Sequence, residues 1–189
     1  MNYSKKEIIT IPNLLSILRL LLIPVFAVLY LKAESAKDYI VSAAVMVFSA
    51  VTDMVDGIIA RKCNMISRLG IMLDPFADKM TQGVVMICLS LRHPEMIPLL
   101  ILFVIKEAFM LIMGCLHLRK KKMLDGALFA GKICTTVLFV SMIAIMVFHN
   151  MPAAVLNIII GICFIFMIIS FAAYAICYLK HSPHIKDIE

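Results

Sequence analysis

Hydrophobic residues along the chain are grouped in six long runs separated by short polar segments. A helix needs about 20 mostly apolar residues to cross the hydrocarbon core of a bilayer. The runs cover residues 14–31, 39–60, 73–91, 96–116, 131–148 and 153–179. The pattern predicts an all-α membrane protein with six transmembrane helices, preceded by a short interfacial helix within residues 1–12. No internal repeat or linker divides the chain, so residues 1–189 are expected to form a single membrane domain.

Composition supports a membrane protein and narrows its class. Hydrophobic residues make up 63% of the chain, whereas a soluble domain has about 45–50%. The first run is too long for a signal peptide and lacks a small-residue cleavage site, so it is expected to stay in the membrane. A net charge of +6 in so apolar a chain indicates basic loops that face anionic lipid, and we expect no nucleic-acid partner. The six cysteines form no CxxC pair and are read as buried hydrophobic residues.

Basic residues outside the runs gather on one side of the predicted membrane. With six spans, the N-terminus, the second loop, the fourth loop and the C-terminus share that side. These segments hold eleven basic residues, namely Lys5, Lys6, Arg61, Lys62, Arg68, Arg119, Lys120, Lys121, Lys122, Lys180 and Lys186. The other side holds only Lys32, Lys37 and Arg92. The positive-inside bias predicts that both termini lie in the cytoplasm. The chain is expected to be a multi-pass protein of the plasma membrane.

Four aspartates interrupt the second and third runs, where a charge is costly. At the bilayer centre each would cost about 2.5–3.5 kcal/mol on the insertion scale. Asp53 and Asp56 are three residues apart, and Asp74 and Asp78 are four apart. Both spacings place the two side chains of a pair on one helix face. The connecting loop is short enough for the two helices to be antiparallel neighbours, so the four carboxylates are expected to converge at the cytoplasmic face.

Converging carboxylates need cations. At an effective dielectric constant near 20, two unit charges about 5 Å apart repel by roughly 3 kcal/mol. Oxygen ligands without histidine or thiolate favour Mg²⁺ or Mn²⁺, and four of them suit a two-metal phosphoryl-transfer site. Two alternatives stay open. The aspartates could form ordinary ion pairs with Arg61, Lys62 or Lys79, or they could line a cation or proton transporter.

Small residues surround the aspartates. Gly57 and Ala60 follow Asp56 on nearby turns, and Gly70 lies one turn before Asp74. Their lack of bulk would let a nucleotide approach the backbone, although close packing of helices would also explain them. Arg61 could bind a phosphate through two parallel hydrogen bonds.

Taken together, residues 53–78 contain DMVDGIIAR and, eight residues later, GIMLDPFAD. The pattern Asp-x-x-Asp-Gly-x-x-Ala-Arg followed by Gly-x-x-x-Asp-x-x-x-Asp resembles the signature of the CDP-alcohol phosphatidyltransferase family at all eight fixed positions. The resemblance implies a six-helix enzyme, expected to be a homodimer, that moves a phosphatidyl group from CDP-diacylglycerol onto an alcohol.

The resemblance also implies residue roles, with two Mg²⁺ or Mn²⁺ ions as cofactors. Asp53, Asp56 and Asp74 would hold one ion, and Asp53, Asp74 and Asp78 the other. Asp78 would also be the general base. The residues expected to contact the CDP-lipid are Asn13, Ser16, Arg19, Gly57, Ala60, Arg61, Ser67 and Gly70.

The acceptor alcohol depends on a looser likeness. The segments IPNLLSILRLLLIPV and LDPFADK resemble the bacterial phosphatidylglycerophosphate synthase branch, whose acceptor is glycerol 3-phosphate. Lys106, Lys132 and Arg119 would suit its phosphate, although Lys106 could instead form a salt bridge with Glu107. That branch is expected to have Arg-Glu where this chain has Lys-Glu. Phosphatidylglycerol, which would give cardiolipin, and inositol phosphate therefore remain alternative acceptors.

Overall fold

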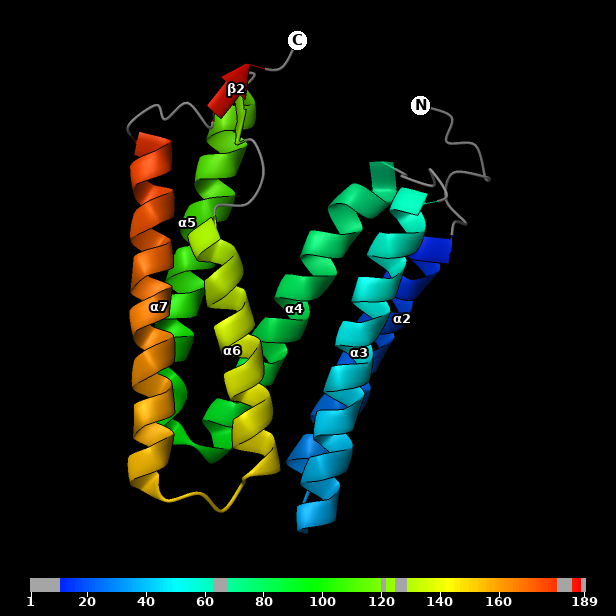
Figure 1. Cartoon of the computed structure of the whole chain (residues 1–189), viewed down its shortest axis with the longest axis vertical. Coiled ribbons are helices and arrows are strands. Elements are labelled where there is room, and N and C mark those ends of the chain that lie inside the picture. The colour runs from blue at the N-terminus through cyan, green and yellow to red at the C-terminus, as the bar shows by residue number, and fades with distance from the viewer. Residues whose placement is uncertain (1–10, 63–67, 120–121, 125–128, 180–184, 188–189) are drawn as a thin grey trace. The chain divides into compact units, whose positions relative to one another are not determined.

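The computed structural model describes the backbone of residues 11–62, 68–119, 122–124, 129–179 and 185–187, and the side chains of 14–52, 55, 76–116 and 129–178. Within these ranges the chain forms six α-helices (Figure 1). They are α2 (Ile11–Leu31), α3 (Ala36–Lys62), α4 (Arg68–Arg92), α5 (Ile97–Arg119), α6 (Phe129–Val147) and α7 (Ala153–Leu179). Each helix coincides with one of the six predicted runs, which confirms the helical fold class.

Three shorter elements complete the described fold. A 3₁₀ turn, η1 (Pro94–Met96), leads into α5. The strands β1 (Lys122–Leu124) and β2 (Ile185–Asp187) pair antiparallel, with Met123 opposite Lys186. This small ribbon is an addition to the predicted all-α fold. The predicted interfacial helix lies outside the described residues, except for positions 11 and 12, which belong to α2.

Four of the described helices are long and apolar enough to cross a membrane. Their apolar segments are Leu14–Leu31, Pro94–Leu116, Phe129–Val147 and Ala153–Tyr178. Helices α3 and α4 are as long as the others, but they carry the four aspartates and several basic residues. The chain is therefore a membrane protein with four candidate spans among its described residues, and spanning by α3 and α4 stays a prediction.

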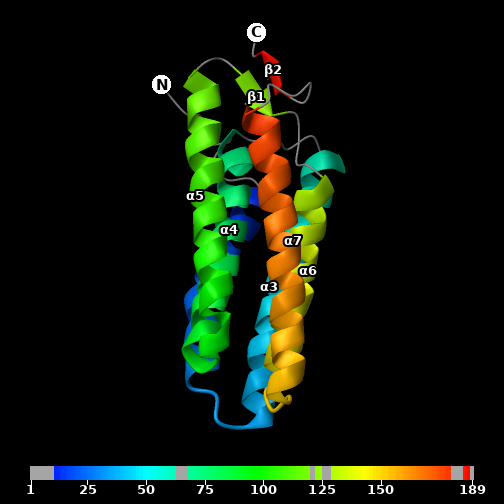
Figure 2. The same ribbon diagram turned by 90° about the vertical axis from the view of Figure 1, so that its left-hand side faces the viewer.

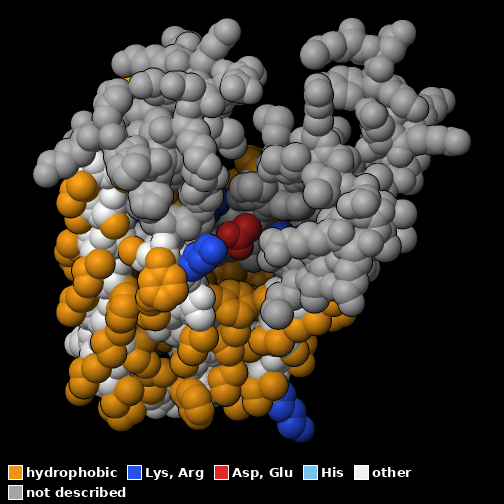
Figure 3. Space-filling model, turned by 45° about the horizontal axis from the view of Figure 1, so that its top comes forward, with side chains coloured by type: hydrophobic (Ala, Val, Ile, Leu, Met, Phe, Trp, Pro, Cys, Tyr) orange, Lys and Arg blue, Asp and Glu red, His pale blue; other side chains and the backbone are white. Residues whose placement is uncertain are grey.

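Apolar side chains cover much of the described surface, as expected for helices in lipid. Figure 3 shows these side chains over most of the described part of the face in view. On α7, for example, Ile158, Ile165, Ile169 and Ile176 are all more than half exposed. Such a surface would be unusual in a soluble monomer, where large contiguous apolar patches are rare. It suits contact with acyl chains.

The internal contacts divide the chain into two compact units. The first comprises Met1–Leu89 and Ile143–His149, and the second comprises Ser90–Met142 and Asn150–Glu189. In the first unit α2 and α3 lie side by side and run in opposite directions (Figure 1). In the second unit α5 and α7 lie side by side and run in the same direction (Figure 2). The candidate site depends on the first unit.

The turn between α2 and α3 is fixed by a cap and by aromatic packing. The Asp38 carboxylate accepts hydrogen bonds from the Ser35 amide at 2.9 Å and the Ser35 hydroxyl at 2.8 Å. The Ser35 amide, followed by the Ser35 hydroxyl and the Glu34 amide, holds the pKa of Asp38 below its ordinary value. Beside this cap, the Tyr30 and Tyr39 rings meet edge to face with centroids 5.7 Å apart. These contacts hold the end of α2 next to the start of α3, so that the two helices run antiparallel.

The second unit contains one very close helix contact. A methyl group built at Gly131 of α6 would lie 2.5 Å from the hydroxyl oxygen of Tyr174 on α7 and 2.9 Å from a carbon of its ring. Tyr174 is buried. Glycine is therefore needed at position 131 to let α7 approach α6.

Because of this close contact, we expect Gly131→Ala to lower the melting temperature of the detergent-purified protein by several degrees. Overpacking a buried contact costs about 1–3 kcal/mol, which outweighs the helix propensity gained by alanine. Gly161→Ala is the matched control, because nothing lies within 4 Å of a methyl group at that position of α7. A Gly131→Ala protein as stable as the Gly161→Ala protein would contradict the prediction.

Candidate active site

The signature aspartates lie on two uninterrupted helices of the first unit. Asp53 and Asp56 belong to α3, which ends at Lys62, and Asp74 and Asp78 belong to α4, which begins at Arg68. The helical backbone at these positions gives each pair the shared face that its spacing predicts. The side chains of Asp53, Asp56 and Asp74 lie outside the described residues. Convergence of all four carboxylates therefore stays a prediction.

Helices α2, α3 and α4 meet at a narrow, almost entirely apolar crevice. Its lining residues are Leu22, Ile23, Phe26, Val45, Met46, Ser49, Thr81 and Val85. Ser49 lies one turn before Asp53, and Thr81 lies one turn after Asp78. The Thr81 hydroxyl donates to the Ala77 carbonyl oxygen of its own helix at 2.8 Å. The three helices thus pack together one turn away from the aspartates, which places the aspartate-bearing turns of α3 and α4 at the same end of this packing.

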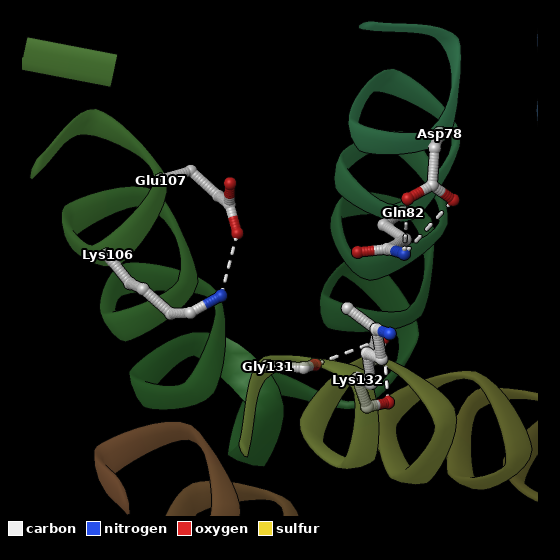
Figure 4. A network of polar contacts seen from close by, with 7 residues as sticks. Asp78, Gln82, Lys106, Glu107, Gly131 and Lys132 are labelled. Atoms are coloured by element: carbon white, nitrogen blue, oxygen red, sulfur yellow. Dashed lines mark hydrogen bonds and ion pairs between the residues drawn. The ribbon is translucent and has the colours of Figure 1, made fainter. Parts of the chain in front are cut away.

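Among the four signature aspartates, Asp78 is the one whose side chain the structure describes. Its carboxylate is half-buried and accepts a side-chain hydrogen bond from Gln82, one turn further along α4 (Figure 4). The Gln82 Nε2 atom lies 3.2 Å from each carboxylate oxygen. Sequence reasoning missed Gln82. The available signal was its position four residues after Asp78, a spacing at which glutamine and aspartate commonly bond on a helix.

The predicted CDP-lipid residues on α2 are polar groups inside the first unit. Ser16 is fully buried and Arg19 is 2% exposed, although both belong to the apolar span of α2. They are three residues apart and share the inward face of the helix. A buried guanidinium is costly unless it meets compensating groups, so this face of α2 is a polar strip within the protein. Whether it contacts a lipid stays a prediction.

The remaining predicted CDP-lipid residues have no described side chains. Gly57, Ala60 and Arg61 are placed on the last turns of α3, and Gly70 on the first turn of α4. Asn13 is placed on the first turn of α2. Ser67 lies outside the described residues altogether.

The cations predicted for the acceptor phosphate belong to the second unit and have different surroundings. Lys106 is buried on α5 and forms an ion pair with Glu107, with Nζ 2.9 Å from the carboxylate oxygen (Figure 4). The salt bridge considered as the alternative for Lys106 is therefore present. Lys132 is exposed in the first turn of α6, where its carbonyl oxygen accepts the hydroxyl groups of Thr135 and Thr136. Arg119 is the last residue of α5, and its side chain is not among those described.

Comparison with known proteins identifies the group to which the chain belongs. The family model for CDP-alcohol phosphatidyltransferase matches residues 9–176. A CDP-diacylglycerol--glycerol-3-phosphate 3-phosphatidyltransferase of Aquifex aeolicus is 35% identical over 133 residues, which cover 70% of this chain and 71% of the relative. A putative cardiolipin synthase of Mycobacterium tuberculosis is 44% identical over 77 residues, 41% of this chain. The cardiolipin synthase (CMP-forming) of Rattus norvegicus is 39% identical over 112 residues, 58% of this chain.

Coverage of the relatives differs. The match spans 35% of the length of the mycobacterial and of the rat relative, but more than two thirds of the Aquifex aeolicus protein. The family match includes α2, α3 and α4 and all eight positions of the aspartate signature. The chain therefore belongs to the CDP-alcohol phosphatidyltransferase family.

Proposed function

We propose that this protein transfers the phosphatidyl group of CDP-diacylglycerol to glycerol 3-phosphate, giving phosphatidylglycerophosphate and CMP. The observation that carries the proposal is the placement of the complete aspartate signature on two continuous helices of one compact unit. Apolar helices of the same chain would hold the lipid substrate in the membrane. The family assignment gives the class of reaction, which is transfer of a phosphatidyl group from a CDP-lipid to an alcohol. The identity of the alcohol is what we propose here.

The donor set fits a pair of hard divalent ions. Carboxylate oxygens are ligands that Mg²⁺ and Mn²⁺ prefer, and the helical spacing allows the two carboxylates of each pair to reach one point. Asp53, Asp56 and Asp74 would hold one ion, and Asp53, Asp74 and Asp78 the other. When bound, the ions would neutralise the pyrophosphate of CDP-diacylglycerol and the charge that develops on departing CMP.

Side chains of the protein would transfer the proton and bind the nucleotide. Asp78 would accept the proton of the acceptor hydroxyl, provided that the hydroxyl comes within about 3 Å. The freed oxygen would attack the phosphorus of the phosphatidyl group in line with the bond to CMP. That bond breaks as the new P–O bond forms, CMP leaves as the phosphate monoester, and no covalent enzyme intermediate is needed. Gly57, Ala60, Arg61, Ser67 and Gly70 would bind the cytidine diphosphate.

The membrane setting follows from the charge distribution. The aspartates lie toward the connection between α3 and α4, in the part of the chain that holds Arg61, Lys62 and Arg68. The positive-inside bias would place this connection, and both termini, in the cytoplasm. A soluble acceptor could meet a membrane-held CDP-lipid at that face. We also propose the plasma membrane as the location and, on the family resemblance alone, a homodimer as the assembled form.

Glycerol 3-phosphate is the favoured acceptor for two reasons. The relative named for that acceptor is matched over 71% of its length, and an anionic acceptor would suit the cations at Lys132 and Arg119, whereas Lys106 is paired with Glu107. A second candidate is phosphatidylglycerol, because the mycobacterial and rat relatives are named cardiolipin synthases. Inositol phosphate is a further alternative.

The acceptor is tested by identifying the lipid product. Purified protein in detergent is supplied with CDP-diacylglycerol, Mg²⁺ and one acceptor at a time. The lipid products are then separated and identified from their masses by mass spectrometry. We expect phosphatidylglycerophosphate from glycerol 3-phosphate and no comparable product from phosphatidylglycerol or inositol phosphate. Cardiolipin from phosphatidylglycerol, with no product from glycerol 3-phosphate, would overturn the acceptor while leaving the reaction class in place.

A further inference from the structure

The amide of Gln82 is held inside the protein against the carboxylate of Asp78. Gln82 is 5% exposed, and its Nε2 atom lies 3.2 Å from both Oδ1 and Oδ2. The two side chains come from consecutive turns of α4 and point toward one another (Figure 4). The contact therefore lies within a single rigid helix of the first unit.

The chemistry of the two groups fixes how they meet. An ionised carboxylate only accepts hydrogen bonds, so the amide must present its nitrogen to Asp78 and turn its oxygen away. Equal distances to the two carboxylate oxygens restrain rotation of the carboxylate about its bond to Cβ. The plane of the carboxylate, and with it the direction in which its remaining lone pairs point, is then set by the amide.

Packing alone does not explain a glutamine at this position. Its only described hydrogen bonds are those to Asp78, and its Oε1 atom is buried without a hydrogen-bond partner among the described residues. Methionine has a similar length and would fill the same space without burying an acceptor. The neighbouring Thr81 differs, because its hydroxyl bonds to the backbone of its own helix. The described role of the Gln82 amide is thus to donate a hydrogen bond to the Asp78 carboxylate.

We propose that Gln82 is a positioning residue that holds the Asp78 carboxylate in the orientation needed to bind a divalent ion and to receive the acceptor proton. The inference rests on the proposed function, since it assigns Gln82 a part in the same site. Ligating carboxylates are commonly oriented by such outer hydrogen bonds, and losing one typically lowers metal affinity or activity about 10- to 100-fold.

The test uses the purified full-length protein and two variants. Gln82→Met keeps the length of the side chain and removes the donor. Gln82→Asn keeps an amide but is one methylene shorter, so it too loses the contact. Both are expected to lower kcat about 10- to 100-fold with little change in KM for CDP-diacylglycerol. The dissociation constant for Mn²⁺, measured without substrate by electron paramagnetic resonance, is expected to rise about tenfold.

Thr81→Val is the matched control, since it removes a partly buried hydroxyl from the adjacent position of α4. It should leave kcat and Mn²⁺ affinity within about twofold of wild type, because its hydrogen bond stays within the backbone of its helix. Melting temperatures of the Gln82 variants should stay close to that of wild type. Variants that keep wild-type kcat and Mn²⁺ affinity would overturn the inference. So would loss of folding in both, because the amide would then be structural.

The outcomes separate this inference from the proposed function. If the wild-type protein releases no CMP but the Gln82 variants still bind Mn²⁺ more weakly, the proposed function fails and the coupling of Gln82 to Asp78 stands. If the wild-type protein is active and both variants match it, the proposed function stands and the role of Gln82 fails.

Discussion

Replacing Asp78 by asparagine is expected to reduce CMP release from CDP-diacylglycerol by at least a factor of about 100, and to bring it near the limit of detection. A positioned general base contributes about 10²–10⁴ to the rate, and an asparagine amide cannot take the acceptor proton. The same change removes a charged ligand of one proposed metal ion. The measurement is kcat for CMP release by the purified variant at saturating acceptor.

Binding of the CDP-lipid should survive this substitution. The nucleotide contacts are assigned to other positions, so the affinity for radiolabelled CDP-diacylglycerol should stay within a few-fold of wild type. Glu95→Gln is the matched control, because it makes the same carboxylate-to-amide change at an exposed residue of η1. It should leave kcat unchanged. Near-normal turnover of Asp78→Asn would show that Asp78 is not the base.

Removing divalent ions is expected to abolish activity altogether. The four carboxylates, which we predict to converge, would repel one another without cations, and the pyrophosphate adds further negative charge. Protein treated with EDTA should release CMP at less than about 1% of its initial rate, a loss within the range that electrostatic stabilisation typically contributes. Excess Mg²⁺ or Mn²⁺ should restore the rate, whereas KCl at equal ionic strength should not. Full activity in EDTA would rule out the metal site and favour simple ion pairs for the aspartates.

The helices could be predicted from the sequence because their signal is local and strong. Each apolar run is long enough for a span, and all six coincide with helices α2 to α7. The largest difference between a run and its helix is at the start of α4, which begins at Arg68 and not at residue 73. A helix can continue into charged residues, because its backbone hydrogen bonds do not require apolar side chains. The apolar run therefore does not mark the end of the helix.

The ribbon formed by β1 and β2 was not predictable. Its strands have three residues each and are separated by more than 50 residues. Such strands are too short for an alternation of apolar and polar residues to predict them. The first strand also includes Lys122, the end of a basic segment that suggests a solvated anchor. Pairing between such distant short segments is decided by the fold around them and not by their own preference.

The helical placement of the signature aspartates was predictable from the sequence, but the contacts around them were not. The spacing of Asp74 and Asp78 predicted a shared helix face, and both lie on α4. The hydrogen bond from Gln82 was missed because a glutamine in a mostly apolar helix gives no sign of being buried. For Lys106 the sequence offered two roles, and its ion pair with Glu107 arises because a buried ammonium group needs a nearby anion.

The most direct test of the central claim is CMP release by the purified protein in detergent, supplied with CDP-diacylglycerol, Mg²⁺ and glycerol 3-phosphate. The account predicts release that requires all three components and is lost in Asp78→Asn protein of unchanged melting temperature. Absence of CMP with glycerol 3-phosphate, phosphatidylglycerol and inositol phosphate alike, from wild-type protein that is folded and binds Mn²⁺, would contradict it.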